Sequence, residues 1–235
     1  MWTSTSGRGI AVDGVLTDLP TWLPPSGRGP GLVLVQEIFG LDDYLRSVAA
    51  ELAAEGYVVA VPELFHRTAP GWSSSHDEAG VAASMKVASA FDPALGLSDV
   101  LATVAHLRAQ PAVSGGVGVL GFCLGGSLAF AAAAAGDPDV AVSFYGSTVA
   151  GQIADLAKIT CPIQFHFGGQ DPYIPRADVA VVEAAVAAHP GAEIHVQEDA
   201  GHAFHNNVAP MFHHPAAAAR AWALTTAFLR RTLPA

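Results

Sequence analysis

The 235-residue chain has few cysteines. Cys123 and Cys161 are the only two, which is too few for a disulfide framework, and they lack the paired spacing of a zinc site. They allow either one bridge or two free thiols. The N-terminus lacks the charged and apolar segments of a secretory signal, so we expect free thiols in a reducing cytoplasm.

Basic residues and long apolar runs are also scarce. The chain holds 11 Lys and Arg against 21 Asp and Glu, a formal net charge of −10. A nucleic-acid-binding surface must neutralise phosphates, and an anionic membrane repels an acidic protein. The longest apolar run, from Leu124 to Ala135, is shorter than the roughly 20 residues of a membrane span. We therefore expect no nucleic-acid or membrane partner, and a monomer or small homo-oligomer that acts on a small molecule.

A hydrophobic fraction of 51% can fill a substantial core. Strand-like and helix-like segments alternate without a linker, which predicts a single α/β domain over residues 1–235, with a mostly parallel sheet and helices on both faces. The expected strands cover 32–35, 57–61, 117–120, 140–144, 163–167 and 193–196. Six helices are expected. The first begins at Asp42 or Asp43, the second passes through Met85 and Phe91, and the third passes through Leu97 and Leu107. The fourth begins at Leu124, the fifth covers 177–188 and the sixth begins at Ala216.

The segment Gly-Phe-Cys-Leu-Gly-Gly at 121–126 follows a predicted strand and opens a predicted helix. This is the context of a nucleophile elbow, here with Cys123 in place of the usual serine. Its flanking glycines permit a sharp turn, the helix N-terminus favours a thiolate, and the N–H of Leu124 can face a substrate oxyanion. The alternative is a glycine-rich turn with an ordinary buried cysteine.

An elbow nucleophile requires an acid and then a histidine later in the chain. Asp171 follows the predicted strand 163–167, and His202 follows the last predicted strand. Asp171 alone would also suit a turn aspartate that bonds its own backbone. The other candidate bases are His166, His189, His195, His205, His213 and His214. A metal site built from His202, His205, His213 and His214 lacks a Glu or Cys ligand at a supporting spacing, so we expect no metal and no cofactor.

Glu37 ends the first buried strand and therefore points towards the same sheet edge as Cys123. We expect it to lie beside the thiol, where its negative charge opposes thiolate formation until substrate displaces or protonates it. The alternative is a helix-capping or solvated carboxylate.

Six motifs, in order, resemble the dienelactone hydrolase family, an α/β-hydrolase branch with a cysteine nucleophile. They are Q-E-I-F-G at 36–40, G-Y-V-V-A-V-P-E-L at 56–64, G-F-C-L-G-G at 121–126, F-Y-G at 144–146, G-G-Q-D at 168–171 and A-G-H-A-F at 200–204. The resemblance implies a triad of Cys123, Asp171 and His202, with Glu37 placed against the resting thiol. It also implies an oxyanion hole formed by the N–H groups of Ile38 and Leu124.

The chain departs from that family where its best-known members bind a lactone carboxylate with two arginines. Val81 and Asn206 stand at those positions, and Met85 and Ala88 replace aromatic residues of the pocket. Losing two charge-assisted contacts weakens carboxylate binding by several kcal/mol. Lys86, Arg67 and Arg176 are candidate substitutes. The residues that we expect to line the substrate pocket are Phe39, Tyr145, Val81, Met85, Phe204 and Asn206.

These observations predict a hydrolase that cleaves an ester or lactone, of the dienelactone or enol-lactone type, through a Cys-His-Asp triad and a thioacyl-enzyme intermediate. An enolate is a good leaving group, which suits a weakly basic thiolate nucleophile. The alternatives are a general carboxylesterase or thioesterase with a more apolar pocket, a non-catalytic binder that retains the fold, and a redox or metal protein that uses Cys123.

Overall fold

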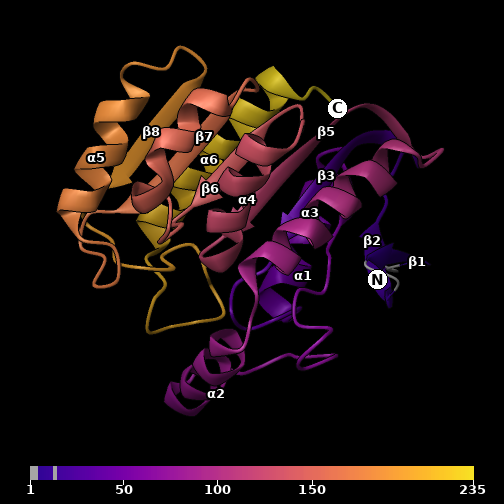
Figure 1. The fold of residues 1–235 in the computed structure, drawn as a ribbon, viewed down its shortest axis with the longest axis horizontal. Helices are drawn as coiled ribbons and strands as arrows, with labels where there is room; N and C mark the ends of the chain where they lie inside the picture. The colour runs from indigo at the N-terminus through magenta and orange to yellow at the C-terminus, as the bar shows by residue number, and fades with distance from the viewer. Residues whose placement is uncertain (1–4, 13–14) are drawn as a thin grey trace.

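The computed structural model describes residues 5–12 and 15–235, with side chains from residue 19 onward (Figure 1). In this part of the chain, eight strands form one sheet in the order β1-β2-β4-β3-β5-β6-β7-β8. The strands are β1 (Thr5–Val12), β2 (Val15–Trp22), β3 (Gly29–Val35), β4 (Val58–Ala60), β5 (Val113–Phe122), β6 (Ala141–Phe144), β7 (Ile163–Gly168) and β8 (Ala192–Gln197). The helices are α1 (Asp43–Ala54), α2 (Glu78–Ser89), α3 (Pro93–Arg108), α4 (Leu124–Ala135), the 3-10 helix η1 (Ala150–Lys158), α5 (Arg176–Val186) and α6 (Pro215–Thr232).

The strands from β4 to β8 in this order pair in parallel, which confirms the predicted α/β architecture. Each predicted strand and helix is present within a few residues of its expected limits. Asp42 caps α1, because its carboxylate accepts the N–H of Leu45 at 2.8 Å. The sequence analysis did not predict three elements, β1, β2 and η1. The first two form an antiparallel hairpin that extends the sheet beyond β4.

Helices cover both faces of the sheet because its inner strands are apolar on both sides. Every residue of β3 is buried, as a strand in the middle of a parallel sheet requires. Leu32 and Leu34 pack in the same cluster as residues of α1 and α6, whereas Val33 and Val35 pack with residues of α3 and α4. Figure 1 shows α3, α4 and α5 in front of the sheet and α6 behind it. The carboxyl ends of the parallel strands therefore share one edge, where loops can assemble a site.

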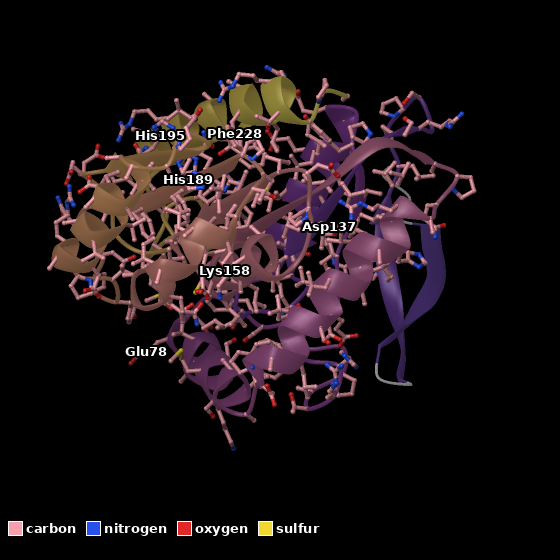
Figure 2. All side chains as sticks on the ribbon, turned by 45° about the horizontal axis from the view of Figure 1, so that its top comes forward. Glu78, Asp137, Lys158, His189, His195 and Phe228 are labelled. Atoms are coloured by element: carbon pink, nitrogen blue, oxygen red, sulfur yellow. The ribbon has the colours of Figure 1, made fainter. Side chains whose placement is uncertain are left out.

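Helix α2 projects from the body of the molecule, with Glu78 at its first turn (Figures 1 and 2). Gly80 and Ser84 are its only buried residues, so it presents most of its surface to solvent. No single helix among the described residues is long and apolar enough to cross a membrane; α2 and α3 meet that criterion only as a pair, bent by 91°.

Candidate active site

Cys123 occupies a sharp turn between β5 and α4. Its backbone has φ 53° and ψ −112°, a conformation that L-residues rarely adopt. A Cβ added at Gly121 would collide with the carbonyl of Gly125, and one at Gly125 with the carbonyl of Val35. The two glycines are therefore a steric requirement of the turn, which has the geometry expected for a nucleophile elbow.

Cys123, His202 and Asp171 form one hydrogen-bonded row. Nε2 of His202 lies 3.2 Å from Sγ of Cys123, and Nδ1 of His202 lies 2.7 Å from Oδ2 of Asp171. The second carboxylate oxygen, Oδ1, accepts the backbone N–H groups of Tyr173 and Ile174 at 2.8 and 3.1 Å. The sequence allowed Asp171 to be either a catalytic acid or a turn aspartate that bonds its own backbone, and its side chain makes both kinds of contact. The bonds of Oδ1 to the loop backbone fix the carboxylate, and Oδ2 then faces His202.

The charge state of His202 follows from these contacts. Burial by itself lowers the pKa of His202. The neighbouring Cys123 and the hydrogen bond to Asp171 raise it by more than burial lowers it, so the resulting pKa is about 10. At neutral pH the imidazolium form is therefore favoured, and its Nε2–H donates towards Sγ. An ion pair of thiolate and imidazolium is the reactive form of a cysteine nucleophile.

Backbone strain is concentrated at this place. Of the described residues, the three non-glycine residues with positive φ are Cys123, Tyr145 (φ 38°) and Ala203 (φ 51°). They lie at the end of β5, just after β6 and directly after His202. Strained backbone of this kind is typical of sites that a rigid scaffold holds in a defined geometry.

Glu37 lies just beyond β3 and is only 3% exposed. Tyr145 donates its hydroxyl to Oε1 at 3.2 Å, and Asn206 donates Nδ2–H to Oε2 at 2.7 Å. Among the residues with described side chains, the hydrogen-bond partners of Glu37 do not include Cys123, and the placement of its carboxylate against the resting thiol stays a prediction. Burial raises the pKa of Glu37 to about 7, against the opposing effect of the Asn206 hydrogen bond.

A second polar pair supports this carboxylate, and the sequence analysis missed it. Nε2 of His76 lies 3.3 Å from Nδ2 of Asn206 and 2.9 Å from Oδ2 of Asp42. The ring of Phe39 packs on His76 with centroids 4.1 Å apart. His76 carries no motif in the sequence, and Asp42 was predicted only as a helix cap, so no local signal indicated the pair.

The six expected pocket residues lie in three places. Tyr145 and Asn206 hydrogen-bond Glu37, and Phe39 packs on His76, which contacts Asn206. Phe204 is completely buried against Phe144 and Tyr145, so it supports the site from the core instead of facing solvent. Val81 and Met85 lie on α2, the first half-buried and the second 57% exposed.

Tyr173 is a neighbour of the site that the sequence analysis did not single out. Its ring lies edge-on to that of His202 with centroids 5.2 Å apart, and it is 61% exposed. It follows Asp171 by two residues, which is the only local signal that could have identified it. An exposed aromatic ring against the base can cover one side of a bound acyl group.

The two expected oxyanion-hole residues lie on segments that meet beside Cys123. Leu124 is the first residue of α4, so its N–H has no partner within the helix. Gly125 packs on the carbonyls of Val35 and Gln36, which brings the segment of Ile38 against the start of α4. Ile38 and Leu124 are both half-buried.

The three cations considered as substitutes for the missing arginines are placed elsewhere. Arg67 forms a two-pronged ion pair with Asp99, at 2.6 and 2.9 Å. Arg176 pairs with Glu183 and Glu198. Lys86 is exposed, on the face of α2 nearly opposite its buried residues.

The other histidines do not form a rival site. His166 is fully buried in β7 and contacts Gln164 and Thr225, and burial holds its pKa well below the usual value. His205 lies 2.8 Å from the hydroxyl of Tyr44, and burial lowers its pKa to about 4. His189 and His195 lie towards the side of the molecule that carries α6 (Figure 2). Over the described residues, no group of three His, Cys, Asp or Glu is arranged to hold a metal ion.

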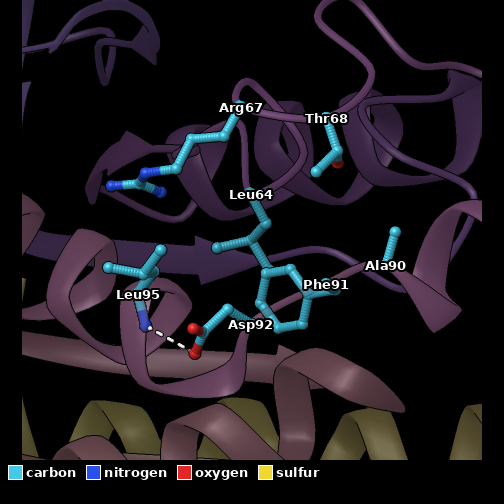
Figure 3. Close-up of a pocket in the computed structure, with 7 residues that line it drawn as sticks. All are labelled: Leu64, Arg67, Thr68, Ala90, Phe91, Asp92 and Leu95. Atoms are coloured by element: carbon cyan, nitrogen blue, oxygen red, sulfur yellow. Dashed lines mark hydrogen bonds between the residues drawn. The ribbon is translucent and has the colours of Figure 1, made fainter.

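A small cavity of about 100 Å³ lies between the segment that follows β4 and the start of α3 (Figure 3). It is lined by Leu64, Arg67, Thr68, Ala90, Phe91, Asp92 and Leu95. Among the described residues, Cys123, Asp171 and His202 are not in its lining.

Comparison with known proteins identifies the family and the fold of the chain. The model of the dienelactone hydrolase family matches residues 18–233. Carboxymethylenebutenolidase of Pseudomonas putida is 36% identical over 182 residues, 77% of each chain, and that of Rhodococcus opacus is 32% identical over 219 residues, 88% of this chain and 83% of the other. The crystal structure of dienelactone hydrolase from Anabaena variabilis, 17% identical, has the same fold, with a TM-score of 0.71 over 99% of this chain and 98% of that one.

The fold is thus an α/β-hydrolase fold, and the protein is a hydrolase that acts on an ester or lactone. The chain belongs to the dienelactone hydrolase family.

Proposed function

We propose that the protein cleaves an enol-lactone or related ester through Cys123, His202 and Asp171, by way of a thioacyl-enzyme. The observation that carries this proposal is the continuous contact from Sγ through the imidazole to a backbone-fixed carboxylate, at 3.2 and 2.7 Å. A cysteine nucleophile, a base and an orienting acid within hydrogen-bond reach are the requirements of covalent acyl transfer.

In the first step the Cys123 thiolate attacks the carbonyl carbon. Negative charge then develops on the carbonyl oxygen, where the N–H groups of Ile38 and Leu124 stabilise it. The carbon–oxygen bond to the leaving group breaks, and His202 gives its Nε2 proton to that oxygen. An enolate is a good leaving group, so an enol-lactone reacts faster than a simple alkyl ester.

In the second step water hydrolyses the thioacyl-enzyme. His202, now neutral, accepts a proton from water as the water attacks the thioester carbon, and the thiolate leaves as the carboxylic acid product forms. Asp171 holds the imidazole in one orientation and stabilises its charged form in both steps. The mechanism requires a free thiol, so we expect the protein to work in a reducing compartment such as the cytoplasm.

A carboxylesterase or thioesterase of uncharged substrates is the second candidate function. The observation that favours it is the charge around the nucleophile. Glu37, Asp42 and Asp171 are buried there, whereas Arg67 and Arg176 pair with acids elsewhere and Asn206 is bound to Glu37. Above pH 7, where Glu37 is ionised, a carboxylate on the substrate meets like charge instead of an arginine.

The test is a panel of lactones and aryl esters assayed with the parent protein and with Cys123→Ala. We expect the substitution to lower kcat/KM by at least about 10³-fold, because it removes the nucleophile. Cys161→Ala is the matched control. Cys161 is a free, half-buried cysteine whose pKa burial raises to about 11, and its loss leaves activity near the parent value. Undiminished hydrolysis by Cys123→Ala would overturn the proposal and revive the non-catalytic binder.

A further inference from the structure

The peptide group that carries the Ile38 N–H lies just beyond the end of β3, outside the sheet. Its carbonyl, which belongs to Glu37, accepts Nε2–H of Gln36 at 3.2 Å. Oε1 of Gln36 in turn accepts the backbone N–H of Leu64, after β4, at 3.2 Å, and this second bond fixes which way the amide faces. Gln36 is completely buried, so water does not compete for either bond.

The next peptide group along the chain is held by Trp72, whose indole N–H donates to the carbonyl of Ile38 at 3.2 Å. The backbone N–H of Ser74 then donates to the carbonyl of Phe39 at 3.1 Å. Gly40 has a φ of 79°, and a Cβ at this position would collide with the carbonyl of Trp72. Glycine therefore lets the two segments lie close enough for these bonds to form.

These contacts fix the peptide groups on both sides of the Ile38 Cα. In a trans peptide the C=O and N–H bonds point in opposite directions, so a Glu37 carbonyl that faces Gln36 turns the Ile38 N–H the other way. Among the described residues, none accepts this N–H in a hydrogen bond. Gly125, next to Leu124, packs on the carbonyl of Gln36, so the second oxyanion donor is positioned against the same segment.

We propose that Gln36 and Trp72 are positioning residues of the oxyanion hole, which hold the backbone of Ile38 so that its N–H faces the substrate oxygen. This inference rests on the proposed function, in which Cys123 attacks a carbonyl and the N–H groups of Ile38 and Leu124 stabilise the oxyanion. A donor that is already aimed at the oxyanion needs no reorganisation as the charge develops. The hydrogen bond that Gln36 donates also polarises the N–H of the same peptide group.

The first measurement is steady-state hydrolysis of 4-nitrophenyl valerate by Trp72→Phe and Gln36→Met. Phenylalanine keeps an aromatic ring and removes the indole N–H, and methionine keeps the length of glutamine and removes both amide groups. We expect kcat to fall about threefold to tenfold in Trp72→Phe and about tenfold to 10²-fold in Gln36→Met. We expect KM to change less than about twofold, because a misaligned donor weakens an interaction made only in the transition state.

The chain offers a matched control for each substitution. Trp222 also donates its indole N–H, to Glu51, and the buried Gln164 also donates Nε2–H, to Glu193 at 3.1 Å. Both bonds lie outside the segment that carries Ile38. We expect Trp222→Phe and Gln164→Met to lower stability while kcat stays within about twofold of the parent value.

The second measurement separates oxyanion stabilisation from a general structural effect. The thiolate of Cys123 adds to the carbonyl carbon of a trifluoromethyl ketone, and the π electron pair of the carbonyl moves to its oxygen, which becomes a tetrahedral oxyanion. The corresponding trifluoromethyl alcohol has no carbonyl and reports binding in the pocket alone. We expect the inhibition constant of the ketone to rise in Trp72→Phe and Gln36→Met by the factor by which kcat/KM falls, and that of the alcohol to stay within about twofold.

Alkylation of Cys123 by iodoacetamide forms no oxyanion, so we expect its rate to be unchanged in both variants. The inference fails if kcat is unchanged in both, or if the constants of ketone and alcohol rise equally. If Gln36→Met does not fold, the same outcomes in Trp72→Phe decide. Failure of the proposed function looks different: Cys123→Ala would still hydrolyse the ester, and the ketone would inhibit it as strongly as the parent.

Discussion

Val35 pairs in register with Gly121, and this pairing places Glu37 level with Cys123 at the edge of the sheet. The strand register thus places Glu37 and Cys123 at the same edge of the sheet, whatever the rotamers of their side chains. The carboxylate then hydrogen-bonds Tyr145 and Asn206, and the thiol contacts His202. Each of the two groups is therefore held by its own hydrogen-bond partners.

The elbow glycines provide the first prediction. Gly125→Ala places a methyl group against the carbonyls of Val35 and Gln36, so α4 must shift away from β3. We expect a loss of about 2–4 kcal/mol in the free energy of unfolding and a loss of at least about 10²-fold in kcat, because Cys123 moves with the helix. Urea unfolding and steady-state assays measure the two effects.

Gly151→Ala is the matched control for this prediction. Gly151 lies in η1 with open space where a Cβ would be, and its φ is not positive. We expect a change of less than about 1 kcal/mol in stability and no change in kcat. Equal effects of the two substitutions would contradict the steric account of the elbow.

The buried Glu37 provides a second prediction, on the pH dependence of stability. Its pKa is raised from 4.5 to about 7 in the folded protein, so the folded state holds a proton that the unfolded state releases between these values. Glu37 therefore favours folding fully below about pH 4.5, and this contribution is lost as the pH rises through 7. Glu37→Gln keeps a neutral side chain at every pH.

We expect the stability of Glu37→Gln relative to the parent to rise by about 1–3 kcal/mol between pH 5 and pH 8. The measurement is urea unfolding of both proteins at several pH values. His202, whose pKa is raised to about 10, adds a slope of the same sign between about pH 6.5 and 10, but it is present in both proteins and cancels. A difference that is constant with pH would show that Glu37 does not hold this proton.

The charge around the nucleophile provides a third prediction, on substrate choice. The 4-nitrophenyl ester of valerate and the mono-4-nitrophenyl ester of glutarate differ in one group, a methyl against a carboxylate. At pH 8, where Glu37 is ionised, we expect kcat/KM to favour the valerate ester by about tenfold or more, because the buried Glu37 carboxylate repels a second carboxylate.

Salt and solution chemistry supply the controls for this comparison. Each enzymatic rate is divided by the rate of hydroxide-catalysed hydrolysis of the same ester, which removes differences in intrinsic reactivity. Added salt narrows the preference if repulsion causes it, since a Debye length of about 10 Å at 0.1 M falls to about 3 Å at 1 M. A preference for the glutarate ester would instead indicate a cation that approaches the substrate.

Most of the fold could be predicted from the sequence because many of its elements carry local signals. Strands buried on both faces, such as 32–35, and helices with clear caps, such as the one at Asp42, carry local signals of their own. The hairpin of β1 and β2 was missed because its residues include Gly7, Gly9 and Pro20, which weaken strand patterning. The Asp13-Gly14 pair between the two runs is a hairpin signal that was available in the sequence.

The sequence by itself determined the order of the strands β3 to β8 and of the helices α1 to α6, the elbow around Cys123 and the places of Asp171 and His202 after their strands, because each depends on residues close together in the chain. Only the tertiary structure decided where Glu37 points. Its partner Asn206 lies 169 residues away, and the His76 that contacts Asn206 lies 130 residues from it. Such contacts form only when the ends of several strands meet, so no local pattern can encode them.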